Sequence, residues 1–99
     1  MKLKFELSKL ALEDINDIWT YSSEQWSNSQ ANKYYKLIFK EIDSICKNPE
    51  IGKSIKEVKN NHRIKIVKSH LIVYKVEEEK IYIDRILHQQ MDIESHLDK

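Results

Sequence analysis

The spacing of apolar residues changes twice along this chain of 99 residues, and this change limits the possible folds more than any other feature. Residues 2–7, KLKFEL, alternate polar and apolar side chains, which is the period of a half-buried strand. Over residues 8–48 the apolar residues recur every three, four or seven positions, as on one face of a helix. After residue 61 the period returns to two. The order strand, helix, strand predicts an α+β fold.

The central part of the chain predicts two helices. Ser8 can cap the first helix, and Ser27 with Gln30 has the spacing of a capping box at the start of the second. Pro49 ends the second helix because proline lacks an N–H donor and restricts the residue before it. The apolar stripe of the first helix comprises Ala11, Ile15, Ile18, Trp19, Ser22 and Trp26. That of the second comprises Ala31, Tyr35, Ile38, Ile42 and Ile45. We interpret the aromatic residues of both helices as packing residues, among them Trp19, Tyr34, Tyr35 and Phe39.

Three strands are predicted in the last third of the chain. They are HRIKIVK, LIVYKV and IYIDRILH, joined by tight hairpins at SH and EEEK. The stretch MDIESHL, residues 91–97, is able to form a short closing helix. The sequence therefore predicts a single domain, residues 1–99, with the order β-α-α-β-β-β. In it an antiparallel sheet packs against a two-helix hairpin and a short C-terminal helix.

The net charge of +1 conceals a basic central segment. Residues 53–75 hold one acidic residue, Glu57, and seven basic residues: Lys53, Lys56, Lys59, Arg63, Lys65, Lys68 and Lys75. This segment is a candidate surface for an anionic partner. Lysines that merely solvate the exposed face of a sheet explain the same pattern, so charge alone does not indicate nucleic-acid binding.

Several function classes receive no support from the sequence. Cys46 is the single cysteine, so no internal disulfide can form, and a reduced cytoplasm is expected. No apolar stretch has the length of a signal peptide core or of a membrane span, so we expect no membrane contact. A glycine-rich phosphate loop and a nucleophile elbow are also missing, and the four histidines lack zinc-site spacing. We predict no metal and no cofactor.

Four stretches resemble the ParE branch of the RelE/ParE superfamily of bacterial toxins. They are LALEDINDIWTYSSEQW (10–26), NPEIGKSI (48–55), HRIKIVKSHLIVYKV (62–76) and IDRILHQQMD (83–92). The last is the most diagnostic, because this branch commonly ends its final strand with an arginine, two apolar residues and a histidine, followed by an aspartate. The chain departs from the pattern in having no glycine at residues 68–70 and Met91 where arginine is frequent.

The resemblance implies the toxin of a type II toxin–antitoxin system. Such a toxin would act in the cytoplasm on DNA gyrase, stall the enzyme on DNA and be neutralised by a cognate antitoxin. The same superfamily includes ribosome-dependent RNases that cleave messenger RNA, and fold alone does not separate the two targets. A third hypothesis is a fold relative that has lost toxicity and only binds an antitoxin.

The candidate site residues are Arg63, Lys65, Arg85 and His88, which we expect to bind a partner. An RNA-cleaving toxin would use Arg63, Arg85 and His88 to hold phosphate and transfer protons. Side chains three apart on an extended strand point to opposite faces, which argues against a ready-made catalytic pair. Gln89 and Gln90 follow His88, where RNA-cleaving relatives often carry a tyrosine. We therefore expect a binding protein, with the nuclease as the alternative.

The alternation along IYIDRILH predicts which face each side chain takes. Arg85 falls in an apolar row with Ile81, Ile83 and Leu87, where a structural ion pair is plausible. The opposite row comprises Tyr82, Asp84, Ile86 and His88. His88 at the strand end is interpreted as a residue that bonds to the backbone and orients the final turn.

The expected partners are a cognate antitoxin and DNA gyrase. A disordered antitoxin segment would fold over hydrophobic grooves and basic strands, with acidic residues meeting Lys65 or Arg63. The chain has no recognisable DNA-reading motif, so operator DNA is expected to be bound only through the antitoxin.

Overall fold

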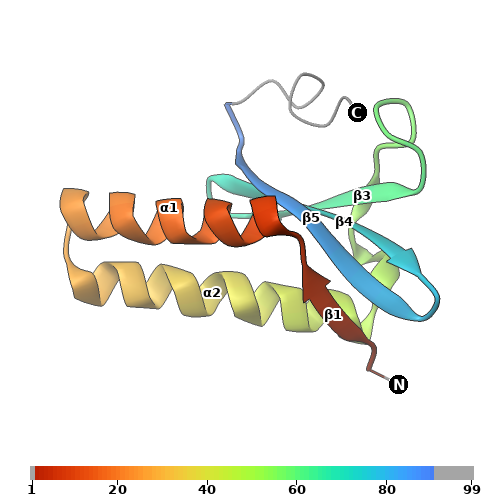
Figure 1. Ribbon diagram of the computed structural model, residues 1–99, viewed down its shortest axis with the longest axis horizontal. Helices are drawn as coiled ribbons and strands as arrows, with labels where there is room; N and C mark the ends of the chain where they lie inside the picture. The colour runs from red at the N-terminus through yellow and green to blue at the C-terminus, as the bar shows by residue number, and fades with distance from the viewer. Residues whose placement is uncertain (1, 91–99) are drawn as a thin grey trace.

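A computed structural model describes residues 2–90, which form two layers, a helical hairpin and a five-stranded sheet (Figure 1). The elements in chain order are β1 (Lys4–Leu7), α1 (Lys9–Gln25), α2 (Asn28–Lys47), the short 3₁₀ turn η1 (Pro49–Ile51), β2 (Lys53–Ser54), β3 (His62–Val67), β4 (His70–Glu77) and β5 (Lys80–His88). The α+β fold and the predicted order of its main elements are confirmed. The short helix predicted at residues 91–97 lies outside the described residues.

The helix boundaries follow from local chemistry. The Ser8 hydroxyl accepts the Ala11 N–H at 2.9 Å, and the Ser27 hydroxyl accepts the Gln30 N–H at 3.1 Å. Each bond satisfies a backbone donor that has no partner inside its helix. Helix α2 ends at Lys47, two residues before Pro49. The Ser8 cap and the predicted stop are therefore confirmed, and of the Ser27–Gln30 capping box the bond from the Gln30 N–H to Ser27 is confirmed.

The sheet has the strand order β1-β5-β4-β3-β2. Strands β2 to β5 pair antiparallel, but β1 pairs parallel with β5, so the sheet is mixed and not wholly antiparallel as predicted. The position of β1 follows from the path of the chain. The helical hairpin carries the chain from β1, at one edge of the sheet, to β2 at the opposite edge. Strand β2, only two residues long, was not predicted; it is too short to have a period.

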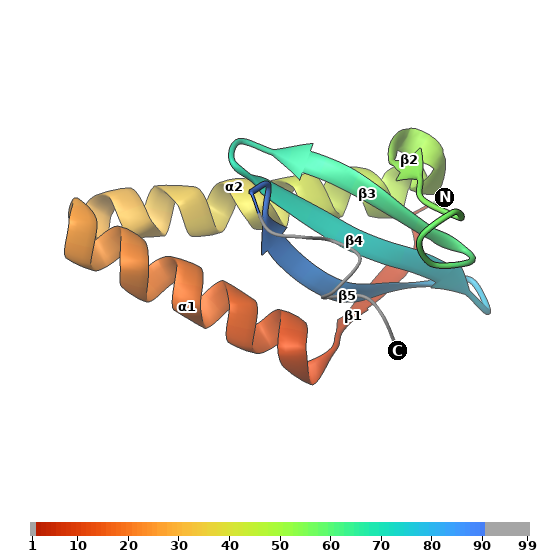
Figure 2. The ribbon, with the colours of Figure 1, turned by 90° about the horizontal axis from the view of Figure 1, so that it is seen from above.

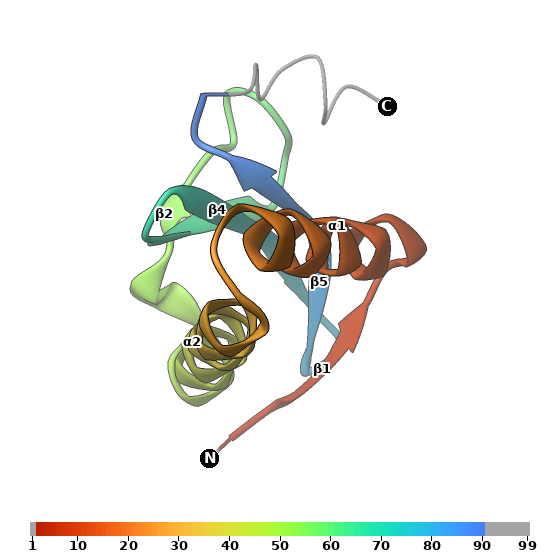
Figure 3. The same cartoon turned by 90° about the vertical axis from the view of Figure 1, so that its left-hand side faces the viewer.

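The main core lies between the hairpin and the sheet, and its fully buried members include Ile38, Ile42, Ile45, Ile72, Tyr74, Ile81 and Ile83. A smaller cluster, Ile55, Val73 and Leu87 with Ile64, lies on the other face of the sheet. Figure 3 shows the two helices end-on beside the sheet. Burial of these side chains is the main favourable term in folding.

A β-bulge at Asp84 reverses the alternation along β5. Val73 pairs with Arg85 and its neighbour Tyr74 pairs with Ile83, which leaves Asp84 as the extra residue. Ile86 consequently joins Ile81 in the helix-side core, whereas Leu87 joins the opposite cluster. The predicted rows are therefore wrong beyond residue 83, because a period of two cannot foresee an inserted residue.

The far half of the hairpin, with the turn between α1 and α2, projects past the end of the sheet (Figure 2). No helix of the described residues combines the length and the apolar character needed to cross a membrane. The projecting hairpin, together with the β3–β4 turn and the end of β5, borders the groove described below.

Candidate functional site

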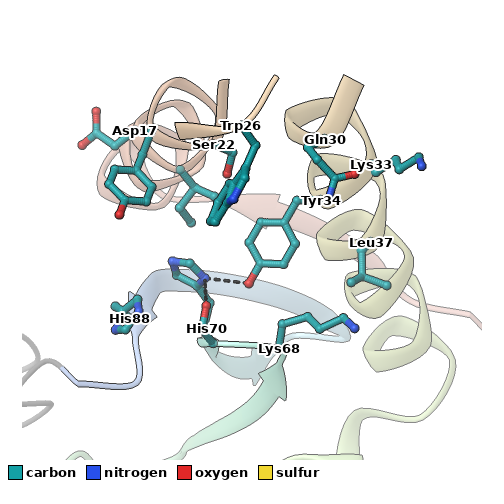
Figure 4. Close-up of a pocket in the computed structure, with 13 residues that line it drawn as sticks. Asp17, Ser22, Trp26, Gln30, Lys33, Tyr34, Leu37, Lys68, His70 and His88 are labelled. Carbon is teal, nitrogen blue, oxygen red and sulfur yellow. Dashed lines mark hydrogen bonds between the residues drawn. The ribbon is translucent and has the colours of Figure 1, made fainter. Parts of the chain in front are cut away.

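A groove of about 710 Å³ lies between the hairpin, the β3–β4 turn and the end of β5 (Figure 4). Its helix side carries two strongly exposed aromatic residues, Tyr21 at 59% and Trp26 at 68%. Their rings meet edge to face, with centroids 6.3 Å apart. Exposed aromatic residues in a concave surface are typical of sites that receive a partner. The other lining residues include Ile18, Tyr34, Leu37, Lys68, His70 and His88.

Tyr34 and His70 form the floor of this groove. The Tyr34 hydroxyl donates to the Val67 carbonyl oxygen at 3.0 Å and lies 2.6 Å from Nδ1 of His70. Because a hydroxyl has one hydrogen to donate, its oxygen then accepts the Nδ1–H of His70. Burial raises the pKa of Tyr34 above its ordinary value of 10.0, so the hydroxyl stays protonated at neutral pH. The α2 helix is thereby tied to the β3–β4 hairpin.

His70 is uncharged at neutral pH. Burial, with a smaller contribution from neighbouring His88, lowers the pKa of His70 from 6.5 to about 4. The two rings, which come from directly paired positions on β4 and β5, lie 5.2 Å apart in an edge-to-face arrangement. At His70 the groove therefore presents a neutral imidazole beside aromatic rings, and Lys33 and Lys68 are the cationic side chains among its lining residues.

The lowered pKa of His70 predicts a specific acid sensitivity. The unfolded chain takes up a proton as the pH falls below 6.5, whereas the folded chain resists protonation until about pH 4. Stability is therefore full above pH 6.5 and decreases between pH 6.5 and 4. Partial contact with water discounts the effect to about 1–2 kcal/mol. Urea unfolding at pH 7 and pH 4.5 should show this extra loss in the wild type relative to His70→Gln. An equal loss in both proteins would contradict it.

Arg85 makes the structural ion pair that the sequence suggested. Its Nε and Nη2 donate to the two carboxylate oxygens of Asp14 on α1, both at 2.9 Å. The same carboxylate accepts the backbone N–H of Ile86 at 2.9 Å. This N–H belongs to the part of β5 that extends beyond its pairing with β1, so Asp14 satisfies an otherwise open strand edge. Arg85 thus joins α1 to β5 just after the bulge.

His88 lines the groove (Figure 4). Its Nδ1 accepts the backbone N–H of Gln90 at 3.1 Å, which is the backbone contact at the strand end that was predicted. Among the described residues no hydrogen bond or ion pair joins Arg85 and His88, since Arg85 is bonded to Asp14 of α1 and His88 to the Gln90 backbone.

Arg63 and Lys65 share the helix-facing side of β3, as their pairing with Tyr74 and Ile72 of the main core indicates. Lys65 pairs with Glu41 of α2 at 3.3 Å. The Arg63 guanidinium donates to the Gly52 carbonyl oxygen at 2.7 Å. His62 faces the other side, where it is 5% exposed and lies 3.6 Å from Asp84. Of the four candidate site residues, Arg63 and Lys65 therefore share one face of the sheet.

Sequence reasoning missed the groove. Trp26 was placed on the apolar stripe of the first helix, but α1 ends at Gln25 and the indole is exposed. Tyr34 was interpreted as a packing residue and His70 only as part of a turn. The available signal was the position of Trp26, directly before the Ser27 cap, since a residue between two helices is free to leave the stripe.

Comparison with solved structures identifies the class of fold. A chain described as the chromosomal ParDE toxin–antitoxin system from P. aeruginosa superposes with a TM-score of 0.77 at 15% identity, covering 88% of this chain and 96% of that one. The toxin–antitoxin complex RelBE2 from Mycobacterium tuberculosis gives 0.69 at 10% identity, covering 89% and 99%. The fold is that of the RelE/ParE-like toxins.

Sequence comparison then identifies the family. The family model described as "ParE toxin of type II toxin-antitoxin system, parDE" matches residues 5–93. Toxin ParE1 of Caulobacter vibrioides is 33% identical over 93 residues, covering 94% of this chain and 96% of the relative. Toxin ParE1 of Mycobacterium tuberculosis is 32% identical over 98 residues, covering 98% and 100%. The chain belongs to the ParE toxin family of type II toxin–antitoxin systems.

Proposed function

We propose that this chain acts in the cytoplasm as a toxin that inhibits DNA gyrase, stalls the enzyme on DNA and is neutralised by a cognate antitoxin. Family membership supports the proposal, since gyrase inhibition is the activity that the resemblance to ParE implies. The structural observation that carries it against the nuclease alternative is the double hydrogen bond from Arg85 to Asp14.

The messenger RNA-cleaving alternative needs Arg63, Arg85 and His88 to converge on one phosphate. Arg85 is instead held by both carboxylate oxygens of Asp14, and His88 lies in the groove beside His70. Arg63 is bonded to Gly52, across the sheet on β3. Within residues 2–90, no hydrogen bond or ion pair joins any two of these three side chains. This arrangement favours a binding protein.

The four predicted binding residues take different roles in this proposal. Arg63 and His88 line cavities and bind partners directly. Arg85 acts as a positioning residue that holds the end of β5 against α1. Lys65 is paired with Glu41, so an acidic antitoxin residue would have to compete with an internal carboxylate.

A supercoiling assay tests the gyrase proposal. Purified chain should inhibit gyrase in proportion to its concentration, and prior addition of the antitoxin should restore activity. Inhibition that antitoxin leaves unchanged, or full supercoiling at a large excess of the chain, would contradict the proposal.

The groove is the proposed site for the antitoxin. Its exposed Tyr21 and Trp26, with Ile18 and Leu37 between the helices, provide the apolar surface that an amphipathic helix requires. A segment that folds on binding would cover this apolar surface, and its release would expose the surface to solvent again. The basic strand β3 ends at Val67, next to Lys68 in the turn that lines the groove, so a longer segment could continue toward this strand.

We expect Trp26→Ser to weaken antitoxin binding about 30-fold, or about 2 kcal/mol, because exposed tryptophans in concave surfaces are frequent hot spots. Leu12→Ser is the matched control, since Leu12 is also exposed on α1, at 50%, but does not line the groove. Isothermal titration with the antitoxin measures both. Equal affinities for the two variants would place the antitoxin elsewhere.

A further inference from the structure

Arg63 differs from the other half-buried cations of the described chain. The others each pair with a carboxylate: Lys59 with Asp84, Lys65 with Glu41, Lys75 with Glu77, Lys80 with Glu6 and Arg85 with Asp14. Among residues 2–90, Arg63 has no such partner, and its one hydrogen bond goes to the neutral Gly52 carbonyl. Partial burial of a cation costs free energy unless an anion compensates it. The missing anion is therefore expected to come from outside residues 2–90.

The Arg63 side chain lies in a cavity that could receive this anion. The cavity, of about 290 Å³, opens between β2, the loop that follows it, and the adjoining ends of β3 and β4. Its polar lining residues are Ser54, Lys56, Asn60, Asn61, His62, Arg63, Tyr74 and Lys75. No acidic side chain of the described residues lines it. Two carboxylates lie next to lining residues: Glu77 is 3.6 Å from the amine of Lys75, and Asp84 is 3.6 Å from Nε2 of His62.

This donor set matches the chemistry of a phosphate. The guanidinium of Arg63 keeps further N–H groups after its bond to Gly52, in a planar fork that fits two phosphate oxygens. Lys56 makes no ion pair within the described residues and is exposed, so its amine can turn into the cavity. Lys75 is already paired with Glu77, but Arg63 and Lys56 together still exceed what one carboxylate would neutralise. A nucleic-acid strand brings several phosphates in succession.

We propose that the cavity at Arg63 binds a phosphate of the nucleic-acid backbone, through which the toxin contacts the DNA held by gyrase. The DNA part of this inference rests on the proposed function. Such a contact positions the protein without reading sequence, so operator recognition stays with the antitoxin. The proposal also assigns the binding role of the basic segment, residues 53–75, to one cavity and not to its charge as a whole.

The test is binding of the purified chain to a labelled duplex of arbitrary sequence, followed by fluorescence anisotropy over a range of salt concentrations. We expect Arg63→Gln to weaken binding about tenfold. The slope of log affinity against log salt should fall by about 1, the value for one lost phosphate contact. Arg63→Lys should lose less affinity for the duplex than Arg63→Gln, since lysine keeps the positive charge. The control Lys36→Gln removes an exposed charge from α2 outside the cavity and should change affinity less than twofold.

Lys56→Gln tests the cavity independently, in case Arg63→Gln weakens binding only because it misfolds. Lys56 is exposed and makes no side-chain hydrogen bond within residues 2–90, so its replacement should leave the fold intact and still weaken duplex binding. If both cavity variants bind the duplex as Lys36→Gln does, the proposal is wrong. It is also wrong if polyglutamate, but not the duplex, depends on Arg63, since the cavity would then serve an acidic protein segment.

Two parallel measurements separate this proposal from the gyrase proposal. Single-stranded RNA that also loses affinity with Arg63→Gln would support phosphate recognition independent of the sugar. Duplex binding that depends on Arg63, in a chain that leaves gyrase supercoiling untouched, would support the cavity and contradict the proposed target. If the chain inhibits gyrase but its duplex binding is the same in the Arg63 and Lys56 variants, the cavity proposal is wrong and the gyrase proposal stands.

Discussion

Replacing Asp14 with alanine is expected to lower the free energy of unfolding by about 3 kcal/mol. The carboxylate accepts two hydrogen bonds from Arg85 and one from the Ile86 backbone, and the side chains of the ion pair are only 17% and 14% exposed. Alanine would leave a mostly buried cation and a strand-edge N–H without partners. Chemical denaturation of the purified chain measures the loss.

Two further variants make the Asp14 result specific. Asp14→Asn should lower the free energy of unfolding by less, because its amide oxygen can still accept one of the three hydrogen bonds. Asp17→Ala removes an exposed carboxylate from the same helix, one turn later, that makes no ion pair within the described residues, and should cost less than about 0.5 kcal/mol. If Asp14→Ala and Asp17→Ala were equally stable, the ion pair would not hold the end of β5.

Gly52→Ala is expected to destabilise the fold by about 3 kcal/mol, at the upper end for overpacking. The backbone φ of Gly52 is −79°, so the problem is space and not conformation. An added Cβ would overlap the Tyr74 hydroxyl, and would lie 2.8 Å from Cε1 of Tyr74 and 2.9 Å from the Ile64 carbonyl oxygen. The ring cannot move away easily, because its hydroxyl accepts the Gly52 N–H at 2.9 Å and donates to the Pro49 oxygen at 2.6 Å.

A double-mutant cycle tests this explanation. Tyr74→Phe alone should cost about 1–3 kcal/mol, because two buried backbone groups lose their partner. Gly52→Ala should then cost less in the Tyr74→Phe background, since the nearest obstructing atom is gone. Thermal or denaturant unfolding of the four proteins gives the coupling. Strict additivity would mean that crowding at Tyr74 is not the cause.

The local features of the fold could be predicted because each depends on residues close in sequence. Ser8 and Ser27 cap their helices through the N–H groups three residues on. The strands β3 to β5 follow from a period of two and from short turns between them. One of those turns, at Lys68, has a left-handed φ of 54° without glycine. The parallel pairing of β1 could not be predicted, because it joins residues about 76 positions apart.

The candidate site was predicted less completely, because it depends on one irregularity and on tertiary contacts. The bulge at Asp84 changes the face of every later residue of β5, so Ile86 and Leu87 exchange places relative to the prediction. An ion pair for Arg85 was expected, but Asp14 lies 71 residues away and no local pattern identifies it. The groove forms where Trp26, His70 and His88 meet from separate elements.

The central claim, that this ParE-family chain acts on gyrase by binding and does not cleave RNA, is tested most directly by two assays on the same antitoxin-free preparation. One measures trapped DNA breaks in the presence of gyrase, and the other measures cleavage of messenger RNA on ribosomes. We predict trapped breaks with intact RNA. Cut RNA with unaffected gyrase would contradict the claim and make Arg63, Arg85 and His88 the catalytic residues to replace next.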